Sequence, residues 1–353
     1  MPPCCRLQCR VQYGWPVSAF AAATGIGSWP GSAPRDAAEI VVGELHQLPH
    51  LVELPARGVG ADLIGRAGAL LVDIAIDTVP RGYRVAARPG AVTRRAASLL
   101  DEDIDALEEA WEKAGGAAGR HAVKVQAPGP ITLAAQLELP NGHRAITDLG
   151  AVRDLAASLA EGVAVHRAEL ARRLSTTVLV QFDEPVLRAA LEGRLTGVTA
   201  LNPVHPIDEA LAITLLDACA AAVGGAALLH TCAAEVPWNV LQRSAIPAVS
   251  LDVGLLGDAG LDGVGEFVDS GRAVVLGVLP TAPPQTRPTV EQVAAAAAAV
   301  TDRLGFPRAV LRERVGVSPA CGLAAAPEKW ARAAIDLAQR AADVIAEDAA
   351  AIH

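Results

Sequence analysis

Short runs of Val, Ile, Leu and Ala alternate along the chain with longer stretches in which apolar residues recur at helical spacing. The nearly continuous apolar character of the runs is typical of parallel strands covered on their outer face. The eight runs span residues 23–28, 51–55, 122–128, 178–185, 227–232, 248–253, 273–280 and 315–323. Stretches between them, such as 151–174 and 290–304, have the spacing of amphipathic helices. Eight strand–helix units predict an α/β fold, a closed (β/α)8 TIM barrel.

An open, doubly wound sheet is the alternative architecture, and the absence of a G-x-G-x-x-G turn after the first run disfavours it. Two long connections, 72–120 and 187–225, are candidate lids or additional helices. The first contains the acidic stretch Asp101–Lys113, which we interpret as a solvated helix face. No Ser/Gly-rich or Pro-rich linker divides the chain, so we expect one barrel domain over residues 18–353.

The first 17 residues lack this patterning. They contain three of the six cysteines, and we expect a disordered tail that is foreign to the fold, with translation starting near Val17. Six cysteines, half of them in such a tail, do not form a disulfide framework. We therefore expect a reducing, cytoplasmic compartment, in which Cys232 and Cys321 are available as thiolates.

Composition narrows the classes of partner. Of 353 residues, 52% are hydrophobic, and the formal net charge is -9. This charge argues against nucleic acid and anionic membranes as main partners. No apolar run reaches the ~18 residues needed to cross a bilayer, and the N-terminal residues do not have the pattern of a secretory signal.

Polar residues end several of the predicted strands, where the chemistry of (β/α)8 barrels collects. His230 and Cys232 end the fifth run, one residue apart, so both side chains point to the same side of a strand. Asp252 ends the sixth run, and Cys321 lies in the eighth. An imidazole, two thiolates and a carboxylate form a tetrahedral set suited to zinc. Ordinary core packing is the alternative for each cysteine, and we interpret Cys219 in this way.

Five motifs in this order resemble the catalytic barrel of the cobalamin-independent methionine synthase family. The resemblance extends from about Ala22 to Ala341. The motifs are Ile26-Gly27-Ser28-Trp29-Pro30, Gly129-Pro130-Ile131-Thr132, Asp183-Glu184-Pro185, His230-Thr231-Cys232 and Cys321-Gly322.

The resemblance implies roles for individual residues. His230, Cys232 and Cys321 are the implied zinc ligands, and Asp252 stands where the family usually has a glutamate. Backbone groups of Ile26, Gly27 and Ser28 are the implied cradle for an amino-acid carboxylate. Asp183 is expected to receive the substrate ammonium, with Glu53 sharing that work. His205 is a candidate proton relay, with a surface loop histidine as the alternative.

These roles predict a zinc-dependent methyltransferase that methylates a thiol such as homocysteine. The methyl donor is either a folate or a methylcorrinoid protein, because full-length members have a second, N-terminal half that this sequence does not contain. The family also places a histidine after the seventh strand, where Leu279-Pro280-Thr281 has none. Two alternatives stay open. One is a metal-free enzyme similar to uroporphyrinogen decarboxylase, with an arginine-lined pocket, and the other is a non-catalytic barrel that binds an amino acid or zinc.

Overall fold

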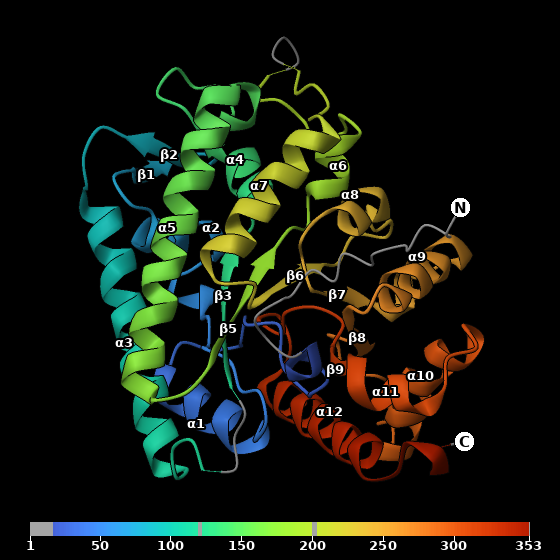
Figure 1. Ribbon diagram of the computed structural model, residues 1–353. Helices are drawn as coiled ribbons and strands as arrows, with labels where there is room; N and C mark the ends of the chain where they lie inside the picture. Colours follow the sequence, from blue (N-terminus) through green and yellow to red (C-terminus); the bar gives the residue numbers. More distant parts are fainter. Residues whose placement is uncertain (1–16, 119–121, 200–202, 353) are drawn as a thin grey trace, which may run out of the picture.

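The computed structural model describes residues 17–118, 122–199 and 203–352. The chain forms an α/β fold around a curled, parallel sheet of six strands in the order β3-β5-β6-β7-β8-β9 (Figure 1). Six of the eight predicted strands are confirmed by this sheet. Its strands are β3 (Val123–Pro128), β5 (Val178–Asp183), β6 (Ala227–Thr231), β7 (Ala248–Asp252), β8 (Ala273–Leu279) and β9 (Val315–Pro319).

The runs 23–28 and 51–55 form isolated bridges instead of strands. Ala23 bridges Val317 of β9, Ser28 bridges Glu53, and His50 bridges Lys124 of β3, all in parallel. Glycine and proline shorten these ladders: Gly27 has a φ of 137°, outside the β region, and Pro49 and Pro55 lack an N–H donor. The two segments therefore lie between the edge strands β9 and β3, although neither is a regular strand.

The two faces of the sheet are packed by different sets of apolar residues, as the alternation of side chains along a strand requires. Leu179, Leu228 and Val275 belong to a small cluster on the concave side, which also includes Phe20 from the 3-10 helix η1 (Val17–Phe20). The neighbouring residues Val180 and Leu229 belong instead to a larger cluster between the sheet and its helices, which extends from Ala23 to Ile352.

Helices surround the sheet, with α3 and α5 on the left of Figure 1, α9 to α11 on the right and α12 below. The last helix, α12, contacts both α10 and α1. The helices are α1 (Pro34–Glu44), α2 (Leu63–Leu70), α3 (Ala91–Lys113), α4 (Pro130–Gln136), α5 (Leu149–Leu174), α6 (Leu187–Leu191), α7 (Glu209–Ala222), α8 (Trp238–Arg243), α9 (Asp258–Asp269), α10 (Val290–Arg303), α11 (Arg308–Arg314) and α12 (Glu328–Asp348). The 3-10 turns η2 (Pro55–Arg57), η3 (Ala145–Thr147), η4 (Val253–Leu255) and η5 (Ala349–Ala351) lie between or after them.

The connection 72–120 packs against the body of the protein. It forms the antiparallel pair β1 (Ala75–Val79) and β2 (Gly82–Ala86), which joins β4 (Leu137–Glu138), and the long helix α3. Helix α3 contacts α1 and α2, and it buries Leu107, Trp111 and Asp103. The interpretation of Asp101–Lys113 as a solvated face was therefore wrong for one side of the helix, because its apolar residues recur at helical spacing between the acidic ones.

The connection 187–225 folds as α6 and α7, with residues 200–202 outside the described part. Asp208 caps the start of α7 by accepting a hydrogen bond from the N–H of Leu211.

The expected tail, residues 1–17, also lies outside the described residues except for Val17. Among the residues that the structure describes, no helix is long and apolar enough to cross a membrane.

Candidate metal centre and the cavity beside it

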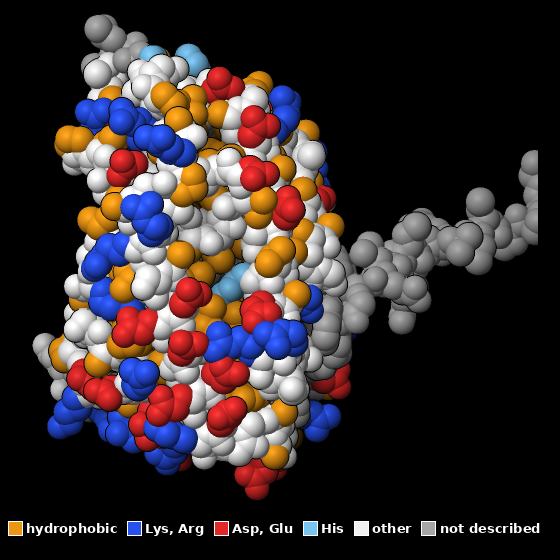
Figure 2. All heavy atoms as spheres, turned by 90° about the vertical axis from the view of Figure 1, so that its left-hand side faces the viewer, with side chains coloured by type: hydrophobic (Ala, Val, Ile, Leu, Met, Phe, Trp, Pro, Cys, Tyr) orange, Lys and Arg blue, Asp and Glu red, His pale blue; other side chains and the backbone are white. Residues whose placement is uncertain are grey.

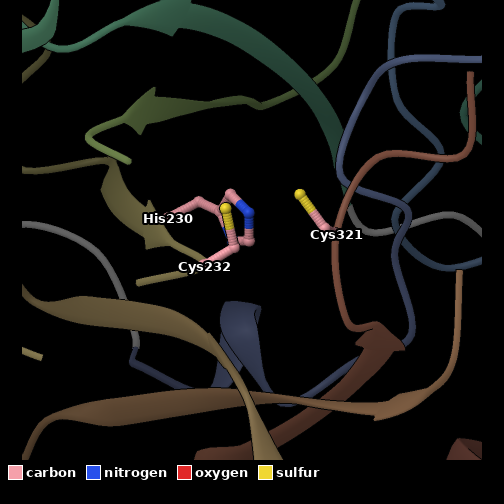
Figure 3. Close-up of side chains that lie close together, drawn as sticks. All are labelled: His230, Cys232 and Cys321. Carbon is pink, nitrogen blue, oxygen red and sulfur yellow. The ribbon is translucent and has the colours of Figure 1, made fainter. Parts of the chain in front are cut away.

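Three side chains from two separate strand ends meet at one point. His230 is in β6, Cys232 follows it, and Cys321 lies two residues after β9. Their candidate ligand atoms all lie within 4.8 Å of one another, and Figure 3 shows Cys321 pointing toward the other two from the opposite side. A nitrogen and two sulfurs at these separations are suited to a tetrahedral ion such as zinc.

The surroundings of His230 favour a metal ligand over an ordinary core histidine. The side chain is buried, and its Nδ1 lies 3.2 Å from the Oγ of Ser250 on β7. Its Nε2 is also buried but has no hydrogen-bond partner among the described residues. A buried polar atom without a partner is costly. A metal ion at Nε2, with Ser250 fixing the other nitrogen, satisfies both ring atoms.

The two thiols interact directly with each other. A hydrogen bond from Cys321 lowers the pKa of Cys232 to about 7. The same contact, together with burial, raises the pKa of Cys321 to about 12. A divalent cation would displace the protons of the pair, because metal-bound cysteines are thiolates.

Asp252 and His205 are not part of this group. The Oδ1 of Asp252 accepts a hydrogen bond of 2.8 Å from the N–H of Gly254 and begins the turn η4. His205 is exposed in the segment that precedes α7. The prediction of Asp252 as a fourth ligand and that of His205 as a proton relay therefore stay predictions. Asp252 lines a neighbouring cavity together with Cys321, whereas the exposed position of His205 gives its role no support.

The predicted substrate residues other than Gly27 line one cavity with the candidate ligands. Its volume is about 310 Å³, which is large enough for a small amino acid. Its lining residues are Ile26, Ser28, Glu53, Pro55, Ala61, Leu63, Asp183, Pro185, His230, Cys232, Cys321 and Gly322. Residues from five separate parts of the sequence thus form a single site at the carboxyl ends of the strands.

Asp183 rests on a buried polar network that the sequence analysis did not identify. Gln181 donates hydrogen bonds of 2.7 Å to the Oδ1 of Asp183 and to the carbonyl oxygen of Ile26. Lys124 is fully buried below them and donates to the Oε1 of Gln181 at 2.6 Å. Burial raises the pKa of Asp183 to about 7, although Gln181 and Lys124 oppose the change. Burial also lowers the pKa of Lys124 to about 7.

Glu53 lies across the cavity and has a similar electrostatic environment. Burial raises the pKa of its carboxyl to about 7, against the attraction of Arg66 and Lys124. The Nε of Arg66 lies 3.7 Å from the Oε1 of Glu53. Two carboxyls with raised pKa values on one cavity wall are suited to receive a cation, because its charge would stabilise their ionised forms.

Two of the sequence motifs bind each other. Glu184 accepts hydrogen bonds from the N–H groups of Ile131 and Thr132 and from the Thr132 hydroxyl, at 2.8, 2.9 and 2.6 Å. The carboxylate thus caps the first turn of α4. Gly129 is required there, since a Cβ on it would lie 2.2 Å from the Oε1 of Glu184. Of the Asp-Glu-Pro motif, Asp183 and Pro185 therefore line the cavity, and Glu184 belongs to the scaffold.

Close neighbours leave no room for a side chain at two glycines of the first segment. A Cβ on Gly25 would lie 2.3 Å from the Nε2 of His50, and one on Gly27 would lie 3.0 Å from the side chain of Gln126. The Oγ of Ser28 lies beside Gly322, where a Cβ would meet it at 2.0 Å. The first segment is thus held against both β3 and the end of β9. Lys124, Gln126, Gln181 and Ser250 carried no sequence signal beyond being polar residues within apolar strands, and that pattern identifies them in retrospect.

Comparison with known proteins gives one family. The pattern of the family described as "Cobalamin-independent synthase, Catalytic domain" matches residues 20–344. No curated protein matches the chain significantly.

Among solved structures, a B12-independent methionine synthase from Shewanella sp. W3-18-1 in complex with selenomethionine superposes with a TM-score of 0.59 at 14% identity. The match covers 93% of this chain and 98% of that one. At this identity it supports the fold alone. The xylanase 10B CBM22-1–GH10 modules of Clostridium thermocellum give a TM-score of only 0.40 at 11% identity, covering 96% of this chain and 67% of that one. A score that low supports no argument.

Proposed function

Given that the chain belongs to the cobalamin-independent methionine synthase family and is a methyltransferase, we propose that it methylates the thiol of an amino acid such as homocysteine with the help of a zinc ion. The observation that carries this proposal is the shared cavity. His230, Cys232 and Cys321 line it together with Glu53 and Asp183, in a space of about 310 Å³.

His230, Cys232 and Cys321 would hold the zinc ion. Bound there, zinc would lower the pKa of a substrate thiol and keep it as a nucleophilic thiolate at neutral pH. The residues of the chain bind and orient the rest of the substrate. Asp183 and Glu53 receive the ammonium group, whose charge offsets the cost of ionising both carboxyls. Ile26 and Ser28 border the same space, where their backbone would accommodate the carboxylate.

The buried network below the cavity would keep these groups in place during the reaction. Gln181 binds both Asp183 and the carbonyl of Ile26, so the two substrate-binding segments share one support. Holding reacting groups in a fixed geometry is a large part of catalysis by proximity.

We also infer that the sheet closes into a single (β/α)8 barrel over residues 18–353. The bridges from Ala23 to β9, from Ser28 to Glu53 and from His50 to β3 lie where two further strands would complete the ring. The contact of α12 with α1 supports the same conclusion, because it joins the last helix to the first.

The methyl donor would approach from the side of Cys321. A second cavity of about 530 Å³ lies beyond this residue, and Cys321 lines both cavities. The donor is a folate or a methylcorrinoid protein, and the assay below distinguishes them.

A paired set of cysteine ligands must stay reduced, which favours the cytoplasm as the compartment.

The geometry disfavours one of the two alternatives. A pocket similar to that of uroporphyrinogen decarboxylase would be lined by arginines, and none of the described residues that line the 310 Å³ cavity is an arginine. A non-catalytic barrel that binds an amino acid or zinc would use the same carboxyls and thiols, so the assay of turnover below distinguishes it from an enzyme.

The test combines metal analysis with turnover. Purified protein should contain stoichiometric zinc, Cys321→Ser should lose it, and Cys219→Ala, which changes a buried cysteine of α7, should retain it. The wild-type enzyme should then methylate homocysteine from either methylcobalamin or methyltetrahydrofolate. Zinc without turnover on both donors would support the non-catalytic alternative, and wild-type protein that never binds zinc would refute the proposal.

A further inference from the structure

A buried row of charges leads from the cavity to the inserted helix α3. Glu53 lines the cavity, Arg66 of α2 lies behind it, and Asp103 of α3 lies behind Arg66. The Nε of Arg66 is 3.7 Å from the Oε1 of Glu53, and the Nη1 of Arg66 donates to the Oδ2 of Asp103. The side chains of Glu53, Arg66 and Asp103 are only 8%, 5% and 0% exposed. Charges so deeply buried require partners.

Asp103 has a second cationic partner. The Nη2 of Arg57, in η2, donates to its Oδ1 at 2.5 Å, and the Nη1 of Arg57 binds Glu102 at 3.2 Å near the surface. Each oxygen of Asp103 is therefore used by a different guanidinium group. Arg66 cannot turn away from Glu53 without leaving a carboxylate oxygen unpaired in the interior, which is costly.

The insertion also holds the chain segment that carries both arginines. The hydroxyl of Tyr83 on β2 donates to Asp62, the N-cap residue of α2, and accepts from the N–H of Gly60. Arg95 of α3 donates to the carbonyl oxygens of Arg57 and Val59, at 2.9 Å each. The same segment supplies Pro55, Ala61 and Leu63 to the cavity lining. The insertion thus supports this cavity wall from behind, which does not fit a lid.

Asp103 differs from the other acidic residues of its helix. Asp101, Glu102 and Asp105 are exposed, and Figure 2 shows acidic and basic side chains mixed across the face to which α3 contributes. The solvated residues explain the acidity of the helix, whereas Asp103 faces inward.

We propose that Arg66, held by Asp103, is a positioning residue that fixes the carboxylate of Glu53 toward the amino group of the bound substrate. The proposal rests on the proposed function for the role of Glu53 as an ammonium ligand. It predicts that the insertion sets the preference for amino-acid thiols over thiols that lack an amino group, although none of the described residues of the insertion lines the cavity.

Calorimetric titration of the zinc-loaded protein tests this with two ligands that differ in the amino group. L-methionine has the group, and 4-(methylthio)butanoate lacks it. The dissociation constant of 4-(methylthio)butanoate divided by that of L-methionine measures recognition of the amine. The ratio should fall about tenfold in Arg66→Gln and in Asp103→Asn, a typical effect of a second-layer change. Glu102→Gln removes a neighbouring ion pair on the exposed side of α3 and should leave the ratio unchanged. Unchanged ratios in all three variants would overturn the proposal, as would an equal loss of affinity for both ligands.

If Arg66→Gln or Asp103→Asn fails to fold, a double variant replaces it in the test. The double variant Arg66→Met with Asp103→Leu removes both buried charges, an exchange that proteins often tolerate, and it should show the same loss of amine recognition. If the wild type does not prefer methionine, the substrate part of the proposed function is wrong. The positioning role is then decided by the ¹³C NMR titration of the Glu53 carboxyl, whose midpoint should rise in Arg66→Gln. An unchanged midpoint would refute the role.

Discussion

The Nζ of Lys124 lies 2.6 Å from the Oε1 of Gln181, in the fully buried interior on the concave side of the sheet. Gln181 extends the interaction to Asp183 and to the carbonyl of Ile26. A single ammonium group thus supports two substrate-binding segments, and its charge partly compensates the carboxyls of Asp183 and Glu53.

Replacing this lysine should destabilise the protein strongly. Lys124→Met leaves Asp183 without a cation and Gln181 without its donor, whereas Glu53 keeps Arg66. We expect a loss of about 3–5 kcal/mol in the free energy of unfolding, the range for breaking a buried charge pair. Lys113→Met removes an exposed pair with Glu109 and should change the stability little, because water screens exposed ion pairs. Urea unfolding at pH 7 measures both, and similar losses would contradict the assigned role of Lys124.

Removing the hydroxyl that binds His230 should weaken metal binding without removing a ligand. Ser250→Ala frees the Nδ1 of His230, and we expect the affinity for zinc to fall by about 10–100-fold. Ser318→Ala is the matched control, because the Oγ of this buried serine on β9 has no partner among the described residues. Competition with a chromogenic chelator gives both affinities. Equal affinities in the two variants would mean that Ser250 does not orient the imidazole.

The raised pKa of Glu53 has a consequence for stability that depends on pH. Burial raises this pKa from 4.5 to about 7, so between these values the folded protein keeps a proton that the unfolded chain releases. Stability therefore falls as pH rises through this window, and the full penalty is present above about 7. Glu53→Gln has no such proton. Its stability relative to the wild type should rise by up to about 3 kcal/mol from pH 4.5 to pH 7.

Thermal unfolding of both proteins at intervals across that range measures the difference. Buried groups such as His50 and His166 titrate in both proteins and largely cancel. Glu109→Gln is the opposite control, because Lys113 and Arg35 lower the pKa of Glu109. Its relative stability should fall slightly as pH rises through the acid range. A flat difference for Glu53→Gln would show that Glu53 titrates normally.

One glycine marks the contact between two helices of the scaffold. A Cβ on Gly162 of α5 would lie 1.6 Å from the carbonyl oxygen of Leu70, at the end of α2. Gly162→Ala should therefore force the helices apart and destabilise the protein by about 1–3 kcal/mol. Gly43→Ala is the matched control in α1, where nothing lies within 4 Å of the added Cβ. It should gain up to about 1 kcal/mol from helix propensity. Equal melting temperatures would contradict this contact.

The periodicity of the sequence predicted those parts of the fold that depend on local burial. Six apolar runs are strands because both of their faces are covered, and that condition is visible as continuous hydrophobicity. The runs 23–28 and 51–55 are also largely buried. There, contacts with residues distant in sequence, such as Gly25 with His50, determine the backbone, and no local pattern encodes them.

The candidate site was likewise predicted only in part. His230, Cys232 and Cys321 were predicted from residue type and position at strand ends, and the structure brings them together. The supports of the site were missed. Arg66 is the single charged residue of α2, and Asp103 is one of several acidic residues of α3. Their burial depends on how the two helices pack against each other, which the sequence does not reveal.

Phe20 closes the end of the sheet interior that lies farthest from the cavity. It packs with Leu48, Leu179 and Val275, and its carbonyl oxygen lies where a Cβ on Gly316 would be. A chain shortened past this residue would admit water from below and hydrate the ammonium of Lys124. An N-terminal deletion could thus impair catalysis from the far end of the molecule while every residue of the cavity remained intact.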